Sequence, residues 1–418
     1  MARACASGGS QHPAILLTDR NARGMLAAAR TLASAGFRVG AAAEVRRAAT
    51  HWSLAARGRH LAPDPRADPE GFVEALAEIV SANAYSALIP GSDAALRAIS
   101  ELRARFPPWL RLGLPPAPVV AAALDKRCLT DVARELGLPQ PRSETCETVE
   151  DALAAARLMG YPVVLKPHST VFVDGDTLQQ RSSRVACDSS ALGRMASDYG
   201  SPFLVQKYLS GATYSLAGVV ADGALPGVAM ARYDRTWPPA AGNAAFATTV
   251  RPPSELLTTA RHLLERLEWR GLFELEYIAR CDGSFVPIDL NPRPYGSLAL
   301  ASAAGAPLAV IWTLILFSDR PDPVVARPDY RYRWEDADLR NVVWTMRRRD
   351  FRAALRAVRP RRRTIHAYFR WSDPAPLAAR ALELSSRAIR RSARGTRPSA
   401  LHPPPHSSPS EPREREPA

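Results

Sequence analysis

Short apolar runs and longer amphipathic runs alternate over the first hundred residues. Apolar runs typical of buried strands occupy positions 14–17, 37–43 and 86–90. Helical stretches are predicted between them, at about 22–35 and 71–83. This alternation predicts an α/β domain whose parallel sheet is covered by helices.

A linker rich in proline and arginine, at positions 106–116, marks the end of this first region. The turn after the first strand, at 18–21, contains no GxGxxG sequence, so a dinucleotide-binding fingerprint is absent. We therefore predict a first domain over residues 1–113, with strand ends that are able to hold part of a substrate.

The region after residue 114 combines strands and helices in a different order. Strands are predicted at 163–167 and 203–209, and residues 214–220 are predicted to return antiparallel after a turn. Residues 298–317 contain no charge and equal a membrane span in length, but Gly-Ala-Pro interrupts them in the middle. Two short buried helices are therefore predicted there, and the second domain is predicted to cover residues 114–320.

The formal charge of +14 is concentrated at the C-terminal end of the chain. Residues 321–418 contain 22 Arg, no Lys and 11 acidic residues, so the rest of the chain is close to neutral. We predict an extension packed on the core at 321–375 and a basic, proline-rich, disordered tail at 376–418. No specific nucleic-acid partner is expected, whereas weak contact of the arginine-rich tail with anionic membranes stays an alternative.

The cysteines and the N-terminus indicate the compartment. The five cysteines are widely spaced and form no CxxC pair, so neither a disulfide framework nor a structural zinc site is predicted. Residues 1–13 contain no apolar segment typical of a signal peptide. We therefore expect a cytoplasmic protein.

The lysines are the first indication of chemistry, because the chain contains only three beside 52 arginines. Lys126, Lys166 and Lys207 occur in largely apolar surroundings, and two of them end or interrupt runs that read as buried strands. A lysine ammonium is a compact charge that reaches a single phosphate oxygen in a narrow cleft, where a guanidinium does not fit. The interpretation as surface lysines left by chance is less consistent with these surroundings.

A predicted hairpin supplies the acidic counterpart. Residues 271–277 and 285–294 form two strands joined by a short turn, with Glu276 opposite Asp289. Asn291 lies on the same face as Asp289, since side chains repeat every two residues along a strand. Two carboxylates and an amide oxygen suit Mg²⁺, which also takes phosphate oxygens. The alternative is an exposed acidic hairpin, an interpretation that suits Glu274 but not Asp289 in its apolar frame.

Together these segments resemble the ATP-grasp superfamily, in particular its carboxylate–amine ligase-like members. The resemblance runs from about residue 14 to 317. It rests on Leu-Asp-Lys ending at Lys126, Val-Val-Leu-Lys-Pro around Lys166, Val-Gln-Lys-Tyr-Leu around Lys207, Glu276, and Ile-Asp-Leu-Asn-Pro-Arg ending at Arg293. It implies a pre-ATP-grasp Rossmann-like domain followed by a two-lobed ATP-grasp fold, with ATP and Mg²⁺, or Mn²⁺ in its place, as cofactors.

The resemblance also assigns roles to single residues. Lys126 and Lys166 are similar to the pair that holds the nucleotide phosphates. The residues similar to the hinge that reads adenine, partly through backbone groups, are Gln206, Lys207 and Leu209. The residues that match the magnesium ligands are Glu276, Asp289 and Asn291. Arg293 matches the arginine that steadies the transferred phosphoryl group, and a weaker match places a mobile substrate loop at 235–243.

The implied reaction is the joining of a small carboxylate to a small amine. Transfer of the ATP γ-phosphoryl group to a carboxylate gives an acyl phosphate, and attack by an amine then gives an amide with ADP and phosphate. This transfer needs positioning and charge neutralisation rather than a covalent nucleophile. Residues 168–175 lack the usual glycine-rich run, so a nucleotide-binding protein without ligase activity stays the alternative.

Overall fold

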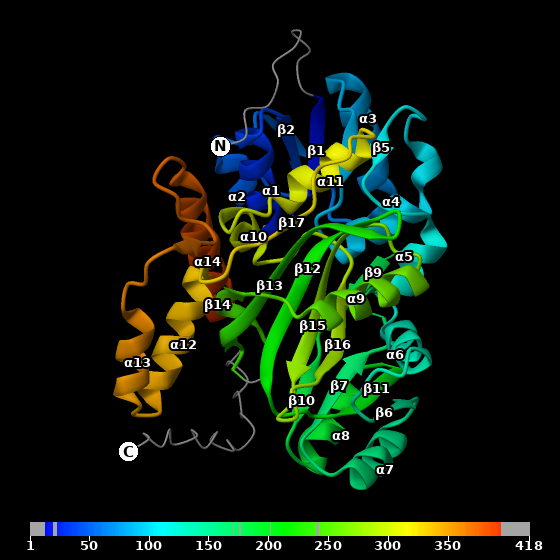
Figure 1. Ribbon diagram of the computed structural model, residues 1–418, viewed down its shortest axis with the longest axis vertical. Coiled ribbons are helices and arrows are strands. Elements are labelled where there is room, and N and C mark those ends of the chain that lie inside the picture. The colour runs from blue at the N-terminus through cyan, green and yellow to red at the C-terminus, as the bar shows by residue number, and fades with distance from the viewer. Residues whose placement is uncertain are drawn as a thin grey trace.

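The computed structural model describes residues 13–19, 23–169, 171–174, 177–200, 202–239 and 242–393. The N-terminal part is a parallel five-stranded sheet of order β3-β2-β1-β4-β5, as the alternation predicted (Figure 1). Its strands are β1 Ala14–Asp19, β2 Arg38–Ala43, β3 Gly58–Leu61, β4 Ala87–Ile89 and β5 Arg111–Leu112. Its helices are α1 Arg23–Ser34, α2 Ala49–Trp52, α3 Pro69–Asn83 and α4 Asp93–Glu101, and the short 3₁₀ helix η1 spans Arg103–Arg105.

A smaller lobe follows, built on an antiparallel four-stranded sheet of order β10-β7-β11-β6. Helices α7 and α8 pack against the face that carries Val163, Leu165 and Val205. A reciprocal cap, in which Thr148 and Asp151 bond each other's backbone N–H, starts α7. The strands are β6 Ser143–Cys146, β7 Val163–Pro167, β10 Arg184–Ala186 and β11 Phe203–Lys207; the helices are α7 Val149–Met159 and α8 Ser189–Ser197; the pair β8 Val171–Asp174 and β9 Thr177–Gln180 forms a separate hairpin.

The largest sheet has the order β16-β15-β12-β13-β14-β18-β19, with β17 paired to β13. Its strands are β12 Ala212–Ala221, β13 Ala224–Trp237, β14 Asn243–Val250, β15 Gly271–Ala279, β16 Phe285–Asn291, β17 Val324–Val325, β18 Arg331–Arg333 and β19 Thr364–His366. The prediction that residues 214–220 return against 203–209 is wrong. Both sides of β11 are already paired, with β7 and β6, so β12 pairs with β13 and β15 instead.

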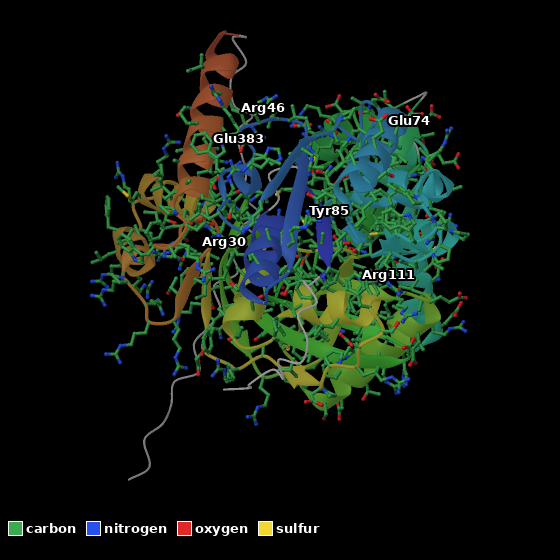
Figure 2. All side chains as sticks on the ribbon, turned by 90° about the horizontal axis from the view of Figure 1, so that it is seen from above. Arg30, Arg46, Glu74, Tyr85, Arg111 and Glu383 are labelled. Carbon is green, nitrogen blue, oxygen red and sulfur yellow. The ribbon has the colours of Figure 1, made fainter. Side chains whose placement is uncertain are left out.

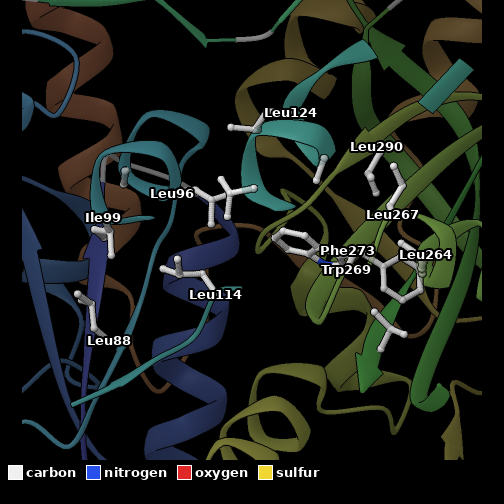
Figure 3. Close-up of a cluster of buried hydrophobic side chains, with 14 of the residues drawn as sticks. Leu88, Leu96, Ile99, Leu114, Leu124, Leu264, Leu267, Trp269, Phe273 and Leu290 are labelled. Carbon is white, nitrogen blue, oxygen red and sulfur yellow. The ribbon is translucent and has the colours of Figure 1, made fainter. Parts of the chain in front are cut away.

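Helices join these layers. Their bounds are α5 Ala117–Leu124, α6 Lys126–Glu135, α9 Ser254–Arg266, α10 Leu298–Ala303 and α11 Leu308–Leu316. One apolar cluster extends from Leu88 and Leu96 in the N-terminal domain to Trp269, Phe273 and Leu290 in and beside the large sheet (Figure 3). The N-terminal domain and the large sheet therefore share one core, which fixes the sheet ends relative to each other.

The uncharged segment at 298–317 forms two short helices, α10 and α11, as predicted. Leu298, Leu308 and Trp312 are buried in the core between the N-terminal sheet and the large sheet. Among the described residues, the structure contains no helix with the length and apolar character that crossing a membrane requires.

The C-terminal segment wraps back onto the body of the protein through α12 Glu335–Arg347, α13 Phe351–Val358 and α14 Ala375–Ala393. Arg30 of α1 donates to the Asp373 carboxylate over 2.9 Å, and Ser53 donates to the same carboxylate over 2.5 Å. Figure 2 shows Arg30 on α1 and Glu383 on α14.

The predicted start of disorder at residue 376 is wrong, because α14 continues to 393. Its first half buries Ala379, and Arg380 pairs with Asp336 and Glu383. The rest of the predicted tail, 394–418, lies outside the described residues, and so does the predicted membrane contact of that part.

Candidate active site

The acidic hairpin forms with the predicted register. Strands β15 and β16 are antiparallel, with Glu276 opposite Asp289 and Glu274 opposite Asn291. Directly opposite residues of an antiparallel pair share a face, and so do residues two apart on one strand. The hairpin therefore presents three carboxylates and one amide on a single face.

The side chains of two lysines from other elements end on this hairpin. Lys126, the first residue of α6, forms an ion pair with the Asp289 carboxylate, and its Nζ lies 3.4 Å from the carbonyl oxygen of Leu290. Lys166, in β7 of the smaller lobe, donates from Nζ to the carbonyl oxygen of Ile288 over 2.7 Å. Two lysines that are 40 positions apart in the sequence thus meet on neighbouring residues of β16.

The third lysine lies elsewhere. In the β7–β11 pair Lys166 is opposite Leu204, so Gln206, two residues on, shares the Lys166 face, while Lys207 is opposite Val163 on the other face. The Lys207 Nζ donates to the carbonyl oxygen of Gly160 over 2.9 Å. The structure therefore brings together the side chains of two of the three lysines, and not the third.

The proposed hinge residues lie at the end of β11, where the chain leaves the smaller lobe for the large sheet. Gln206 is buried and donates from Nε2 to the Ser143 hydroxyl over 2.9 Å. The backbone N–H of Lys207 donates to the carbonyl oxygen of Arg142 over 2.8 Å. Leu209 is half-buried in the connection between β11 and β12. A role for Lys207 at this point would therefore use its backbone.

Arg293 follows the hairpin and is held by an aspartate that sequence analysis did not single out. Its Nε donates to the Asp93 carboxylate over 2.6 Å, and its Nη2 lies 3.3 Å from the Asn291 amide oxygen. Asp93 is 3% exposed and begins α4, directly after the Ser92 cap beyond β4. The signal was its position at the carboxyl end of a predicted strand, which is where α/β sheets place functional groups.

Glu274 was also misjudged, because the sequence interpretation placed it on an exposed hairpin. It is 5% exposed, and its carboxylate accepts a hydrogen bond from the Asn291 amide nitrogen over 3.1 Å. The Tyr233 hydroxyl lies 3.2 Å from Glu274 and 2.9 Å from Glu276. The two-residue repeat that placed Asn291 beside Asp289 also places Glu274 beside Glu276, and so it was available in the sequence.

Burial disfavours the charged forms of Glu274 and Glu276. Burial raises the pKa of Glu274 to about 8, with further repulsion from Glu276, while Arg293 opposes the shift. Burial also raises the pKa of Glu276, against the Tyr233 hydroxyl, the two lysines and Arg293.

The lysines shift in the opposite direction. Burial lowers the pKa of Lys126 to about 8, and the carboxylates of Asp93 and Glu276 oppose this change. Burial and the neighbouring Lys126 lower the pKa of Lys166 to about 7, while Glu276 opposes them. Buried groups whose pKa values move toward neutrality gather at functional sites.

The hairpin also fits the metal expected from the sequence. Within the described residues, no three His, Cys, Asp or Glu side chains are grouped so as to hold a metal by themselves. Two facing carboxylates, Glu276 and Asp289, and the Asn291 amide offer hard oxygen atoms. Mg²⁺ is commonly bound by one or two carboxylates together with substrate phosphates, so this incomplete set suits it.

The segment predicted as a mobile substrate loop is partly fixed. Strands β13 and β14 pair from Met230 to Trp237, with Trp237 opposite Asn243. Arg235 donates to both oxygens of the Asp338 carboxylate, over 2.7 and 3.0 Å. Its guanidinium group therefore belongs to an ion pair with α12 rather than to a free loop.

Comparison with known proteins identifies the domain that carries this site. Residues 125–315 match the family model described as "Carbamoyl-phosphate synthase L chain, ATP binding domain". This segment, just under half of the chain, resembles an ATP-grasp domain. The matched segment contains Lys126, Lys166 and the whole β15–β16 hairpin, while Asp93 lies outside it, in the N-terminal domain.

Curated relatives match over the same part of the chain. The carbamoyl phosphate synthase large chain of Thermomicrobium roseum is 28% identical over 202 residues, which is 46% of this chain and 18% of that protein. The C-terminal section of the Aquifex aeolicus large chain is 28% identical over 208 residues, or 37% of its length. The chain thus spans well under half of the length of these relatives.

Solved structures share the fold over a longer stretch. An ADP complex of N5-carboxyaminoimidazole ribonucleotide synthetase has a TM-score of 0.59 at 14% identity and covers 76% of this chain and 80% of its own. The biotin carboxylase domain of Hydrogenobacter thermophilus 2-oxoglutarate carboxylase, with MgADP and bicarbonate, has a TM-score of 0.59 at 15% identity, covering 77% and 74%.

An L-amino acid ligase from Bacillus licheniformis has a TM-score of 0.56 at 11% identity, covering 75% of this chain and 76% of its own. These coverages exceed the ATP-grasp domain alone. At such identities the likeness shows the fold, and it confirms the ATP-grasp fold that the sequence predicted.

Proposed function

We propose that this protein uses magnesium–ATP to activate a carboxylate as an acyl phosphate, which an amine then attacks to give an amide. The observation that carries the proposal is the convergence of Lys126 from α6 and Lys166 from β7 on the acidic face of the β15–β16 hairpin. A buried set of opposite charges with shifted pKa values is suited to a highly charged ligand.

The nucleotide would be bound at its phosphate end by residues on and around this face, and at its adenine end by residues at the end of β11. Lys126 and Lys166 would hold its phosphates, while Gln206, the backbone of Lys207 and Leu209 would meet the adenine. Glu276, Asp289 and Asn291 would hold Mg²⁺, which neutralises phosphate charge when bound. Present contacts of the lysines, with Asp289 and the Ile288 carbonyl, would be exchanged for phosphate contacts.

The chemistry needs an activated acid, because a carboxylate repels nucleophiles and has oxide as its leaving group. A carboxylate oxygen attacks the γ-phosphorus of ATP and ADP departs, which makes phosphate the new leaving group. The amine nitrogen then attacks the acyl carbon, loses a proton and expels phosphate. Arg293, fixed by Asp93, would stabilise the negative charge on the transferred group.

The proposal is tested by measuring phosphate release from ATP over a matrix of carboxylic acids and amines, with product masses determined. Bicarbonate belongs among the acids, because a solved structure with this fold contains it. We expect release that depends on both an acid and an amine. ATP binding without release by any pair would instead favour a nucleotide-binding protein without ligase activity.

A matched variant separates this activity from contamination. Arg293→Met should retain ATP binding through the lysines but lower phosphate release by about a hundredfold or more, because charge on the transferred group is no longer stabilised. Release that is unchanged in this variant would contradict the proposed role of Arg293.

A further inference from the structure

Helices α12 and α13 form a hairpin at the outer edge of the molecule, away from the N-terminal sheet and the smaller lobe (Figure 1). The two helices contact each other through a small apolar cluster of Val342, Ala354 and Ala357. The base of the hairpin is fixed by Asp338, which pairs with Arg235, and by Asn341, which donates to the Thr236 carbonyl oxygen over 2.9 Å. The hairpin is therefore an ordered part of the fold that is attached to β13.

Each helix of the hairpin exposes one apolar stripe. On α12 the exposed fractions are 63% for Leu339, 41% for Val343 and 47% for Met346. On α13 they are 64% for Phe351, 58% for Leu355 and 51% for Val358. Both sets follow the spacing i, i+4, i+7, which places the three side chains of each helix on one helical face.

The same hairpin and the loop that follows it are strongly basic. Between residues 339 and 363 the chain contains ten arginines and a single acidic residue, Asp350. The arginines at 347–349, 352, 356, 359 and 361–363 are exposed. Arg348 lies over the Trp344 ring, with 4.9 Å between the guanidinium carbon and the ring centroid. An amphipathic helix with arginines beside an apolar face is the composition that binds at a membrane surface.

We propose that the α12–α13 hairpin docks on an anionic lipid bilayer surface. Its apolar stripes would enter the boundary between headgroups and acyl chains, while its arginines would bind lipid phosphates through several N–H groups at once. This proposal is independent of the proposed ligase activity, because it concerns exposed side chains of α12 and α13, whereas the candidate active site is built on α6, β7, β15 and β16.

Three other occupants agree less well with these observations. Nucleic acid would use the arginines but would leave six exposed apolar side chains without a partner. A second copy of the hairpin would bring two strongly positive surfaces together. The remaining C-terminal sequence, 394–418, contains one large apolar residue, Leu401, and so offers little to cover two stripes.

The experiment is cosedimentation of the full chain with lipid vesicles. One set is phosphatidylcholine alone, and in the other set about a third of the lipid is phosphatidylserine. We expect binding to the anionic vesicles, weakened by salt, and binding to the neutral vesicles that is at least about tenfold weaker.

Two double variants separate the apolar from the charged contribution. Phe351→Ser with Leu355→Ser should lower the partition onto anionic vesicles by about tenfold or more. Arg352→Gln with Arg356→Gln should lower it by roughly tenfold to thirtyfold. All four side chains are exposed, so circular dichroism and thermal melting should match those of the unchanged protein.

Matched controls carry the same changes elsewhere. Leu54→Ser with Leu158→Ser alters side chains that are 71% and 73% exposed, and Arg57→Gln with Arg105→Gln removes two exposed charges. Both controls should bind vesicles as the unchanged protein does. Equal loss in hairpin and control variants, or no preference for anionic vesicles, would overturn the proposal. So would dimerisation or nucleic-acid binding that needs the hairpin while vesicles are ignored.

Discussion

Two buried collections of charge in this protein differ in how completely their charges are paired. In the first, the Asp338 carboxylate is 5% exposed and meets two guanidinium groups: Arg235 at 2.7 Å and Arg333 at 3.0 Å. The Arg235 contact uses both carboxylate oxygens, which is the geometry that a planar guanidinium favours. This collection holds α12 against β13 and β18.

In the second collection, on the β15–β16 hairpin, the charges lie near one another but are less fully paired. Glu274 and Glu276 share the hydroxyl of Tyr233 and repel each other, and Lys166 donates to a carbonyl rather than to a carboxylate. The pKa values of the acids rise and those of the lysines fall. Buried charged groups that are incompletely paired lower the stability of a fold. Their presence here favours a charged ligand as their binding partner.

Removing the acid of the well-paired collection should produce the largest loss of stability. In Asp338→Ala, two arginine side chains that are each 19% exposed lose their buried carboxylate partner, and the free energy of unfolding should fall by about 3–5 kcal/mol. Denaturant unfolding measures this change. Asp131→Ala, on the exposed surface of α6, is the control and should change the free energy by less than about 1 kcal/mol. Equal effects would show that the Asp338 pairs are not structural.

In the less fully paired collection, removal of a charged side chain is expected to raise stability rather than lower it. Lys166→Met removes a buried cation whose pKa is lowered to about 7, so the melting temperature should rise by at least ~2 °C. ATP affinity should fall by about a hundredfold or more, because the charge that faces the phosphates is lost. Isothermal titration and thermal melting measure both quantities on the same sample. Retained affinity would remove Lys166 from the site.

Lys207→Met, in the same smaller lobe, is the comparison for Lys166→Met. Its ammonium group bonds the Gly160 carbonyl on the opposite face of β11, so the side chain is remote from Lys166. We expect ATP affinity to fall by at most about threefold, which is the loss of one weak contact. A loss as large as that of Lys166→Met would show that the Lys207 side chain, and not its backbone, binds the nucleotide.

Asp289→Asn tests the metal assignment. The amide keeps the shape of the side chain but removes the charge that both Lys126 and a divalent cation require. The Mg²⁺ concentration needed for half-maximal ATP turnover should rise by about tenfold. The measurement is a Mg²⁺ titration at fixed nucleotide, and an unchanged midpoint would exclude Asp289 from the ligand set.

Local patterns explain why much of this site was predictable. The predicted hairpin turn placed Glu276 opposite Asp289, strand alternation placed Asn291 on the face of Asp289, and the rarity of lysine indicated Lys126 and Lys166. The same alternation places Glu274 on the face of Glu276. The interpretation of Glu274 as exposed followed from its acidic side chain and not from this position. Local pattern therefore fixed which residues share a face within one hairpin.

Contacts between distant segments were not predictable in this way. Asp93 reaches Arg293 across 200 positions, and no local signal links them. The Lys207 side chain lies on the opposite face of the sheet from Lys166, because a shift of one strand position changes the face. The rarity of lysine in the chain does not indicate on which face a lysine lies. The exposed apolar stripes of α12 and α13 were likewise not predictable, because the sequence does not show which face of each helix is covered by the rest of the fold.

The last prediction is that ATP binding to the less fully paired collection depends on pH. The groups that face Lys166 are Lys126 and Glu276, and the pKa of its ammonium is lowered to about 7. The triphosphate binds the protonated form and raises that pKa, so affinity is highest below about pH 7 and falls as pH rises through this value. ATP affinity should decrease by about fivefold between roughly pH 7 and 8 in titration calorimetry.

In Lys166→Arg the cation does not deprotonate, and the decrease over this interval should disappear even if the larger group binds ATP less tightly. A decrease that persists unchanged in Lys166→Arg would assign the titration to another group, with Lys126 next, since burial lowers its pKa to about 8.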